Sequence, residues 1–574
     1  MAISTSSKPN MAIGKFCLVM ALVCLVPQMS HQAAFLERDY DSDYYTAGVV
    51  EFRPSVLSQK DNVDSYVEII GSTDASEAEI IVFPEATLNG QTTATFVPPP
   101  EELIAPCLTD PNATYYEEFF VALSCAARNA SKYVVVNLSE KQLCTDTPED
   151  PRPCSSTGVN QFNTNVVFDR EGVVISRYRK IHLYGEPRNS TYLPELSTFT
   201  TDFGVTFGHF ICFDILFFDP AHQLILEQGI TDFVFPTMWF SQLPYLTAVQ
   251  YQQGWAYAQN VNLLAAGASN PLIGSSGSGI YHGREGTITS VMKTGIGERH
   301  IYVAKVPKFK ETRQTRKSFR SRRSVDSEAP RVLSSEFRMK QDYIQNYKSE
   351  VLPIDENQRE SGNLTKDICY DDTFCCHFEV TWQPLDEQSN SSYYYYRLGA
   401  YNGWRNEQNV DGNYIRNCGI FSCTGPEIED CAKLITDNEN AQPQVTFTRL
   451  VIDVTYPESK EFIFVPNTLL DNLLPLEPSQ FEWTQTPTSN GYQHQVHFAL
   501  AENVEVSNLL TFAVYGNYYN EICTYGAGTR EDNIQCGYAD EDNEGGTAAH
   551  MQSFGAWLIM PLAVILGSIQ FKCL

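Results

Sequence analysis

Residues 43–305 alternate between short apolar runs and longer segments with helical spacing, and this alternation limits the fold more than any other feature of the 574-residue chain. Runs rich in β-branched and aromatic residues indicate strands, and they lie at 45–52, 79–83, 133–138, 165–168, 173–177, 207–211, 232–235 and 261–266. Helical spacing predicts helices at 115–130, 219–228 and 243–259. Strands that alternate with helices in this way predict a layered α/β domain.

The second half of the chain has a different composition. From about residue 340 to 540, apolar runs rich in β-branched and aromatic residues are separated by clusters of Pro, Gly and Asn. Eight cysteines lie in this part, so we expect a smaller, disulfide-stapled β-rich domain without a catalytic signature. The expected organisation is a signal peptide at 1–33, a first domain at 34–305, a basic linker at 306–335, the β-rich domain at 336–542 and a removed tail at 543–574.

Both ends of the chain have the layout of processing signals. At the N-terminus, lysines precede a short apolar segment at 16–26, as in a secretory signal peptide. At the C-terminus, small and polar residues precede a short apolar tail, which is typical of a signal for a glycosylphosphatidylinositol (GPI) anchor attached at Asn543, Gly545 or Gly546. A short membrane helix is the alternative for this tail. The basic linker is either a solvated loop or a processing site for a protease that cuts after Arg323.

Further features point to the outside of the cell. Asn-x-Ser/Thr sequons are glycosylation sites of secreted proteins, and the chain has them at Asn112, Asn129, Asn137, Asn189, Asn363 and Asn390. The formal net charge of −29 argues against a nucleic-acid partner, because phosphate binding needs clustered cations. We therefore expect an extracellular protein held at the cell membrane by a lipid anchor.

The cysteine count indicates one free thiol. Of the 16 cysteines, Cys17, Cys24 and Cys573 lie in the terminal signals, which leaves an odd number. In an oxidising compartment, an odd number indicates an unpaired thiol. If Cys212 is that thiol, four cysteines lie before it and eight after it, so disulfides can close within each half, in pairings that the sequence leaves open. The same compartment argues against zinc, and no metal site is expected.

Three polar side chains directly follow predicted strands of the first domain, namely Glu85, Lys180 and Cys212. Sites in layered α/β sheets gather beyond the carboxyl ends of the strands. A thiol there can attack a carbonyl carbon and form a thioester, while a carboxylate moves the protons as general base and acid. We assign these roles to Cys212 and Glu85. Lys180 and the backbone N–H of Phe213 would stabilise the oxyanion.

Each of these residues also has an ordinary interpretation on its own. A glutamate after a strand is commonly a solvated turn residue, a lysine is commonly a surface cation, and a free cysteine is commonly a buried thiol. His182 and His209 flank the same segments, and a Cys–His pair would indicate a papain-like protease instead. Composition and spacing alone do not decide between these interpretations.

Longer segments around the three residues resemble the nitrilase (carbon–nitrogen hydrolase) superfamily, and within it the vanin/biotinidase branch. The segments that carry the resemblance are Phe-Pro-Glu at 83–85, Tyr-Arg-Lys-Ile-His-Leu at 178–183, the stretch 212–221, Phe-Pro-Thr-Met-Trp at 235–239 and Gly-Ser-Gly-Ile-Tyr at 277–281. The resemblance implies a nitrilase-type α-β-β-α sandwich with a Glu–Lys–Cys triad and no cofactor. It also implies a second glutamate, with Glu186 as candidate and Glu195 as alternative. Trp239 is either a wall of the substrate pocket or a core residue.

The function that this resemblance implies is an extracellular amidase that cleaves a linear, non-peptide amide through a cysteine thioester. Similarity to vanins implies pantetheine as the small-molecule substrate, with pantothenate and cysteamine as products. Similarity to biotinidase implies biotinyl-lysine amides instead. We prefer pantetheine, because the anchoring tail suits vanins. The alternative of another class is a catalytically silent surface binding or adhesion protein on the same fold.

Overall fold

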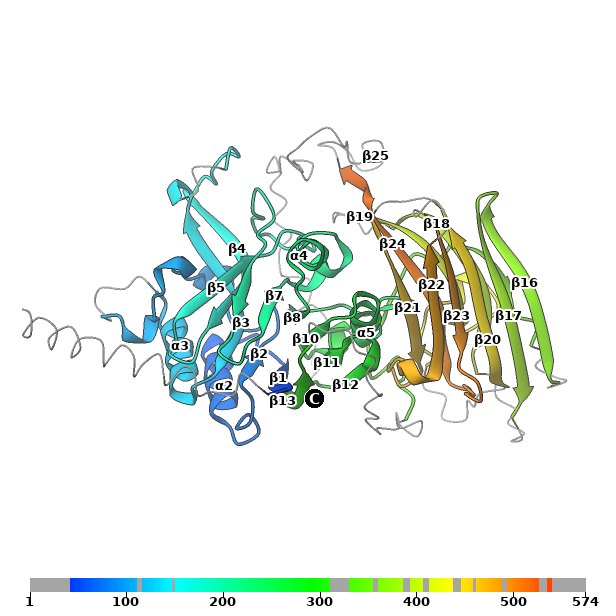
Figure 1. Ribbon diagram of the computed structural model, residues 1–574, viewed down its shortest axis with the longest axis horizontal. Helices are drawn as coiled ribbons and strands as arrows, with labels where there is room; N and C mark the ends of the chain where they lie inside the picture. The colour runs from blue at the N-terminus through cyan, green and yellow to red at the C-terminus, as the bar shows by residue number, and fades with distance from the viewer. Residues whose placement is uncertain are drawn as a thin grey trace, which may run out of the picture.

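The computed structural model describes residues 42–110, 116–146, 150–309, 330–354, 360–385, 393–405, 412–436, 445–457, 461–487, 493–525 and 534–538. The expected signal peptide, the GPI signal, Arg323, Asn112 and Asn390 lie outside these residues. The described part forms an α/β domain followed by a β-rich domain, and the two lie side by side (Figure 1).

The first domain is built on two six-stranded sheets, sheet A and sheet B, which are parallel at their centres. Sheet A has the order β13-β1-β2-β3-β4-β5, with β1 (Tyr44–Phe52), β2 (Ile80–Val82), β3 (Tyr133–Leu143), β4 (Val159–Phe168), β5 (Val174–Arg179) and β13 (Arg299–Pro307). Sheet B has the order β12-β11-β10-β8-β7-β6, with β6 (Thr198–Thr200), β7 (Thr206–His209), β8 (Asp232–Thr237), β10 (Asn262–Gly267), β11 (Ser278–His282) and β12 (Gly286–Val291).

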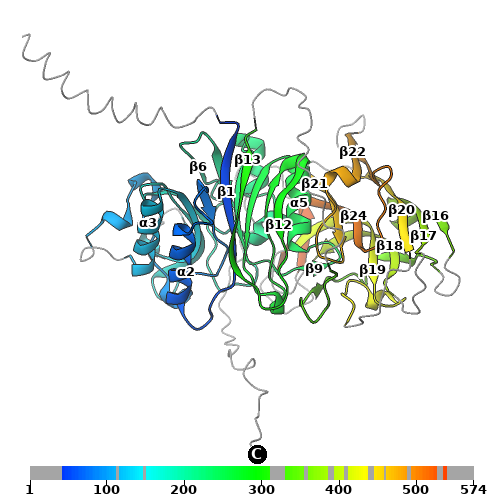
Figure 2. The same cartoon turned by 90° about the horizontal axis from the view of Figure 1, so that it is seen from below.

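Side chains of β1 show how the layers pack. Ala47 and Val49 lie in the core between the two sheets, whereas Val50 and Phe52 lie in the core between sheet A and its helices, because successive side chains of a strand point to opposite faces. The helices α2 (Gln59–Gly71) and α3 (Glu118–Ala130) cover sheet A (Figure 2), and α4 (Ala221–Gln228) and α5 (Ala248–Gln259) cover sheet B (Figure 1). The predicted α-β-β-α sandwich is confirmed.

Two helices differ from the prediction. The helix expected from residue 243 begins only at Ala248, because strand β9 (Gln242–Leu243) and Pro244 precede it and a capping box fixes its start. Helix α2 was not predicted. Its N-cap Ser58 is an ordinary helix-start signal, but a polar residue, Asn62, is among its buried positions, which weakens the apolar periodicity.

The second domain is a sandwich of two antiparallel sheets. One has the order β15-β18-β19-β24-β21, with β25 paired to β24, and the other has the order β16-β17-β20-β23-β22. The strands are β15 (Lys348–Val351), β16 (Gly362–Asp371), β17 (Phe374–Pro384), β18 (Tyr395–Arg405), β19 (Gly412–Cys423), β20 (Val445–Tyr456), β21 (Phe462–Leu470), β22 (Phe481–Pro487), β23 (His494–Leu500), β24 (Leu509–Tyr525) and β25 (Ile534–Tyr538). The rings of Phe498 and Phe512 stack at 4.1 Å across the two sheets. The β-rich second domain is therefore confirmed.

Disulfides among the described residues close within each half of the chain, as expected. They join Cys107 to Cys125, Cys144 to Cys154, Cys369 to Cys375, Cys376 to Cys418, and Cys423 to Cys431. The side chains of Cys523 and Cys536 lie outside the described part. Cys212 is the one free cysteine of the described residues, and it is buried.

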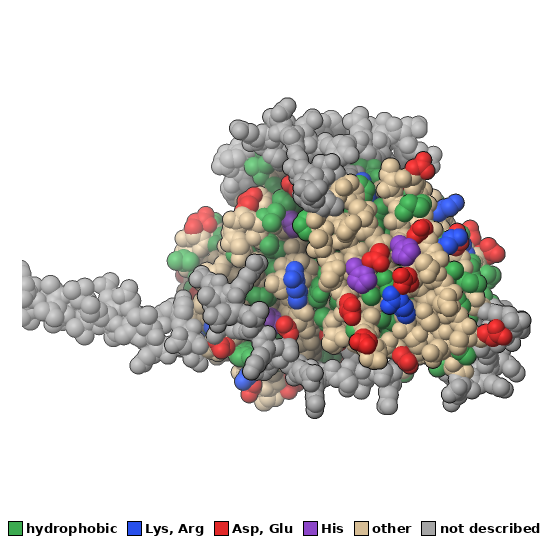
Figure 3. Space-filling model, turned by 45° about the vertical axis from the view of Figure 1, so that its right-hand side comes forward, with side chains coloured by type: hydrophobic (Ala, Val, Ile, Leu, Met, Phe, Trp, Pro, Cys, Tyr) green, Lys and Arg blue, Asp and Glu red, His purple; other side chains and the backbone are tan. Residues whose placement is uncertain are grey.

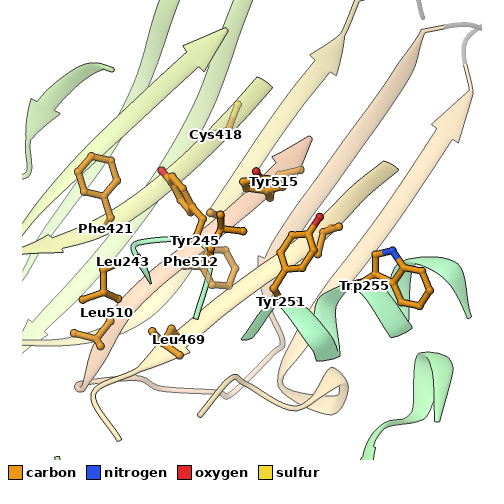
Figure 4. Close-up of a cluster of buried hydrophobic side chains, with 14 of the residues drawn as sticks. Leu243, Tyr245, Tyr251, Trp255, Cys418, Phe421, Leu469, Leu510, Phe512 and Tyr515 are labelled. Carbon is orange, nitrogen blue, oxygen red and sulfur yellow. The ribbon is translucent and has the colours of Figure 1, made fainter. Parts of the chain in front are cut away.

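The two domains share a continuous hydrophobic core (Figure 4). Tyr245 and Tyr251 of the first domain pack against Tyr515 of β24. Gly254 of α5 approaches β21 so closely that a Cβ there would lie 2.4 Å from a methyl group of Val465. Such tight apolar contact holds the β-rich domain at a defined position beside sheet B.

The predicted glycosylation residues of the described part fall into two groups. Asn129, Asn189 and Asn363 are exposed, so their sequons stay candidate acceptors. The prediction for Asn137 is wrong. This residue lies in β3 with 2% of its surface exposed, and its side-chain amide bonds to neighbouring residues inside the domain, so a glycan has no room there.

Candidate active site

The three predicted catalytic residues come together beyond the strand ends. Glu85 lies three residues after β2, Lys180 directly follows β5, and Cys212 opens the 3-10 turn η5 (Cys212–Leu216) that comes after β7. All three are buried. The Lys180 ammonium donates a hydrogen bond of 2.7 Å to Glu85 Oε1, and both charges act on the Cys212 thiol. The structure therefore brings a carboxylate, a cation and a thiol together from the two sheets.

Cys212 has a strained backbone and a neutral thiol. Its φ of 49° lies in the left-handed region, which costs a non-glycine residue about 1–2 kcal/mol and is found at functional sites. Burial raises the pKa of the thiol well above its ordinary value, Glu85 raises it further, and Lys180 opposes them. A thiol with such a pKa keeps its proton near neutral pH, so its attack on a carbonyl needs a neighbouring base.

Lys180 is held between two carboxylates. Besides its bond to Glu85, its ammonium donates to Glu186 Oε1 at 2.5 Å. Burial by itself would lower the pKa of Lys180, but the attraction of Glu85 and Glu186 outweighs it and holds the pKa well above the ordinary value. For Glu186, burial would raise the pKa, whereas Lys180 and a hydrogen bond from Asn163 hold it below the usual range. Lys180 therefore carries a permanent charge at a fixed position.

An asparagine network, which the sequence analysis missed, positions these groups. Nδ2 of Asn163 on β4 donates to Glu85 Oε1 at 2.8 Å and to Glu186 Oε2 at 2.6 Å. Oδ1 of Asn163 accepts from Nδ2 of Asn137 on β3 at 2.7 Å, and Asn137 Oδ1 accepts from the backbone N–H of Ala86. One amide thus sets the distance between the two carboxylates that flank the lysine.

The signal for this network is present in the sequence, but it is weak. Asn163 and Asn165 are buried in β4, although residues 160–165 of that strand are polar except for Phe162. A buried polar group needs a hydrogen-bond partner, so asparagines on a central strand indicate a polar contact. The predicted hairpin strand began only at residue 165, so Asn163 fell outside it.

Asp214 ties the cysteine segment to the lysine segment. Its carboxylate accepts from the Tyr178 hydroxyl at 2.8 Å, from the His182 backbone N–H at 3.0 Å and from the Ile211 backbone N–H at 2.9 Å. The group is fully buried, and burial raises its pKa to about 6. Two of these donors lie on either side of Lys180 in the sequence, and the third directly precedes Cys212. The three bonds therefore fix the lysine segment and the cysteine segment relative to each other.

The remaining candidates lie elsewhere. Glu195, the alternative second glutamate, accepts from the backbone N–H of Arg179 at 3.0 Å and faces that arginine, so Glu186 is the glutamate at the lysine. His209 bonds to the Ser176 hydroxyl in the core, and burial lowers its pKa to about 3. The His182 ring stacks on Phe217 at 3.9 Å. These contacts favour a Glu–Lys–Cys site over a papain-like pair.

A pocket of about 330 Å³, open mouth included, reaches the Cys212 thiol. We call it the thiol pocket, and its other lining residues are Tyr184, Phe213, Leu216, Met238, Trp239, Phe240, Gln242, Leu246 and Arg405. Trp239 is part of the wall, and its indole N–H donates to the Leu246 carbonyl at 2.8 Å, which fixes the ring. Arg405 comes from β18 of the second domain, which the sequence analysis did not connect with the site. The pocket is mostly apolar, as is typical of small-molecule sites.

The family follows from comparison with known proteins. The sequence pattern of the carbon-nitrogen hydrolase family matches residues 46–259, and that of the vanin C-terminal domain matches residues 337–522. Vanin-like protein 1 of Drosophila melanogaster is 61% identical over 556 residues, which cover 96% of this chain and 97% of that protein. The chain belongs to the vanin family of carbon–nitrogen hydrolases.

Two more distant members of this group have named activities. A pantetheine hydrolase of Homo sapiens is 28% identical over 525 residues and covers 88% of this chain and 92% of its own length. A biotinidase of Homo sapiens is 29% identical over 524 residues and covers 84% of this chain and 90% of its own length. With nearly equal identities, neither relative decides the substrate.

Membership of the vanin family makes the chain a hydrolase of carbon–nitrogen bonds, as the sequence predicted. Its disulfides fit an oxidising compartment outside the cytosol. Within the described ranges, no helix is both long and apolar enough to cross a membrane. In the same ranges, no group of His, Cys, Asp and Glu side chains has the arrangement of a metal site.

Proposed function

We propose that this vanin-family protein hydrolyses the linear amide bond of pantetheine to pantothenate and cysteamine, with Cys212 as the nucleophile. The observation that carries the proposal is the contact chain of the site: a neutral, buried thiol beside Glu85, with the Glu85 carboxylate bonded to the Lys180 ammonium at 2.7 Å. This chain ends at a mostly apolar pocket that can take the acyl group.

In the first half of the proposed reaction, the acyl group moves to the enzyme. Glu85 accepts the proton of Cys212 while the sulfur attacks the amide carbonyl carbon. The carbonyl oxygen becomes an oxyanion, and the Lys180 ammonium and the Phe213 backbone N–H stabilise it. Glu85 then gives its proton to the amine nitrogen, the carbon–nitrogen bond breaks, and cysteamine leaves a thioester on Cys212.

In the second half, water releases the acid. Glu85 accepts a proton from a water molecule as its oxygen attacks the thioester carbon, and the same two donors stabilise the second oxyanion. The carbon–sulfur bond breaks and the sulfur regains a proton, so the enzyme returns to its starting state with pantothenate as product. One carboxylate is enough for both halves, because Glu85 gives up the first proton to the leaving amine before it accepts the next one from water.

Glu186 has a positioning role in this proposal. It accepts a second hydrogen bond from the Lys180 ammonium besides the one to Glu85, so the ammonium keeps its place when Glu85 is protonated during the reaction. A second anion also keeps the ammonium protonated in that intermediate, because an opposite charge nearby favours the charged form.

The choice of pantetheine rests on the pocket and on the related pantetheine hydrolase. The pantothenoyl group has a branched apolar part and uncharged hydroxyl and amide groups, which suit a pocket with aromatic walls and a few polar side chains. A biotinyl group likewise combines an apolar chain with an uncharged polar group, its ureido group, so biotinyl-lysine amides stay the second candidate. The proposed location is the cell surface after secretion, with a GPI anchor at Asn543, Gly545 or Gly546.

The deciding experiment incubates the purified, secreted ectodomain with pantetheine and, separately, with biotinyl-lysine, and follows amine release. Turnover of pantetheine that disappears in Cys212→Ser supports the proposal, and faster turnover of biotinyl-lysine would reassign the substrate. No turnover of any small amide, together with a thiol inert to alkylation, would indicate a silent surface protein. For the anchor, phosphatidylinositol-specific phospholipase C should release the protein from cells, and retention would favour a membrane helix.

A further inference from the structure

One charged side chain of the thiol pocket comes from outside the catalytic domain. Arg405 ends strand β18 of the β-rich domain, lies 8% exposed, and lines the same pocket as Cys212. None of the proposed chemical steps uses it. Desolvation offsets the Coulombic gain even of a paired buried arginine, so the place of Arg405 in the wall of a mostly apolar pocket points to a function.

Arg405 is held in place from two directions. Its Nε forms an ion pair with Asp342 Oδ2 at 3.2 Å, and both side chains are less than 9% exposed. Another guanidinium nitrogen donates to Gln242 Oε1 of the first domain, and Gln242 also lines the pocket. Strand β14 (Lys340–Gln341), which leads into Asp342, pairs with β9 in a parallel register. The guanidinium is thus fixed where the two domains meet.

The charges around Arg405 select the kind of group that it can bind. Asp342 balances the guanidinium, so the pair has no net charge to offer an anion. Two further carboxylates, Glu85 and Glu186, are paired with the single cation Lys180. An acidic acyl group would therefore meet no unbalanced cation in the pocket, whereas an uncharged oxygen can accept a hydrogen bond from the guanidinium or the Gln242 amide. A purely alkyl group would desolvate both polar side chains without replacing their hydrogen bonds to water.

We propose that Arg405 and Gln242 form a specificity subsite for an uncharged oxygen acceptor, a hydroxyl or an amide or urea carbonyl, at the far end of the acyl group. The preferred substrates are linear amides whose acyl chain carries such an acceptor, and simple alkyl amides are disfavoured. The inference rests on the proposed amidase function and deepens it. It states which substrates the pocket prefers from the side chain that the second domain contributes to the pocket wall.

The test measures the hydrolysis of three p-nitroanilides by the wild-type protein and by Arg405→Met. The acyl groups of the three substrates come from pantothenic acid, biotin and hexanoic acid. Methionine keeps an apolar stem of similar length and removes all donors. We expect wild type to favour the two acceptor-bearing substrates. In Arg405→Met, kcat/KM for these substrates should fall about 10- to 100-fold, the effect of one charge-assisted hydrogen bond. Hexanoyl anilide should change less than about threefold on the same scale.

A matched control is Arg449→Met. Arg449 lies on the outer face of the β-rich domain, in an exposed ion pair with Glu379, among the charged side chains and histidines that gather on this face (Figure 3). This variant should leave all three kcat/KM values unchanged. The control shows whether the effect of Arg405→Met comes from losing a positive charge anywhere in the protein or from losing the arginine in the pocket.

Gln242→Leu keeps the test decisive if Arg405→Met folds poorly, because it leaves the Arg405–Asp342 ion pair intact. It should lower selectivity for acceptor-bearing substrates in the same direction. The rate of Cys212 alkylation by iodoacetamide reports whether each variant keeps a native site. Equal losses on all three anilides in a variant with native alkylation would overturn the inference.

The outcomes also separate this inference from the proposed substrate. If the biotinyl anilide is cleaved and the pantothenoyl anilide is not, pantetheine is the wrong substrate, yet the biotinyl-to-hexanoyl ratio still tests Arg405. If wild type prefers hexanoyl anilide to both others, the subsite is refuted while the amidase function stands.

Discussion

Asn163 offers the sharpest test of how the site is built, because a single amide bonds to both carboxylates around Lys180. We consider Asn163→Leu, which keeps the branching and number of side-chain heavy atoms and removes the donor and the acceptor. Glu85 and Glu186 each lose one hydrogen bond, and one Asn137 donor bond is lost. Buried Glu85 then keeps its bonds from Lys180 and from the Met238 backbone N–H, and partly exposed Glu186 keeps its bond from Lys180.

The magnitude follows from the number and kind of these bonds. A hydrogen bond to a charged group contributes about 1.5–3 kcal/mol. The bond to buried Glu85 counts in full, whereas water can partly replace the bond to Glu186, whose side chain is 23% exposed. We expect the free energy of unfolding to fall by about 3 kcal/mol. If the loss of alignment costs a similar amount in the transition state, kcat/KM falls about 100-fold.

The pH dependence provides a second readout. A hydrogen bond from Asn163 helps to hold the pKa of Glu186 below its usual range. Without this donor the protonated form is relatively favoured, so a higher pH is needed to keep the carboxylate ionised beside Lys180. The acid limb of the kcat/KM profile should therefore move to higher pH in Asn163→Leu.

The assay combines urea unfolding with pH profiles of pantothenoyl p-nitroanilide hydrolysis. Gln161→Leu is the matched control, because Gln161 lies two residues away on β4 and its amide donates to the Gln91 backbone carbonyl instead of a carboxylate. It should keep the wild-type acid limb and nearly full activity. Asn163→Leu with activity within threefold of wild type and an unchanged acid limb would refute this account of the site.

Further variants test the nucleophile, the cation, a buried carboxylate and the domain interface. Cys212→Ser should abolish turnover and leave the unfolding transition unchanged. Lys180→Met removes the cation from buried Glu85 and partly exposed Glu186, so kcat should fall at least about 100-fold and stability by about 3–5 kcal/mol, measured by kinetics and urea unfolding. Burial raises the pKa of Glu51 from 4.5 to about 7, so the folded state binds the extra proton and stability falls as pH rises between these values, by up to about 3 kcal/mol. Glu51→Gln should remove that slope from the pH dependence of unfolding. Gly254→Ala, whose Cβ would lie 2.4 Å from a side chain of β21, should cost about 1–3 kcal/mol and lower the Tm, whereas Gly90→Ala, with open space around its Cβ, should not.

These experiments have clear contrary results. Full activity of Cys212→Ser would remove the thioester mechanism. A Lys180→Met protein as stable as wild type would contradict the buried ion cluster. Equal pH slopes for wild type and Glu51→Gln would place the proton on another group, and an unchanged Tm of Gly254→Ala would show that the two domains do not meet there as tightly as the structure indicates.

Much of the site could be predicted because its signals are local. Glu85 and Lys180 each follow a strand whose apolar run is visible in the sequence, and cysteine parity singled out Cys212, the one free cysteine of the described residues. The supporting residues could not be predicted in this way. Asn137 has the local sequence of a glycosylation site, yet its place opposite Asn165 in the register of β3 and β4 buries it beside Asn163. Sequons are read locally, whereas burial depends on neighbouring strands.

The sequence by itself determined the α/β alternation of the first domain, the free thiol and the types of group available for chemistry, because apolar periodicity and cysteine parity are properties of the chain alone. Helix α2 and strands β6, β9, β11, β12 and β13 were not predicted from it. Tertiary structure decided which of two glutamates, Glu186 or Glu195, meets Lys180, since both are close to it in sequence and only the path of the loop separates them. It also decided that Arg405 of the second domain lines the thiol pocket. That contact arises where two domains pack against each other. Which surfaces become buried together depends on residues far apart in the sequence, so no local sequence pattern predicts it.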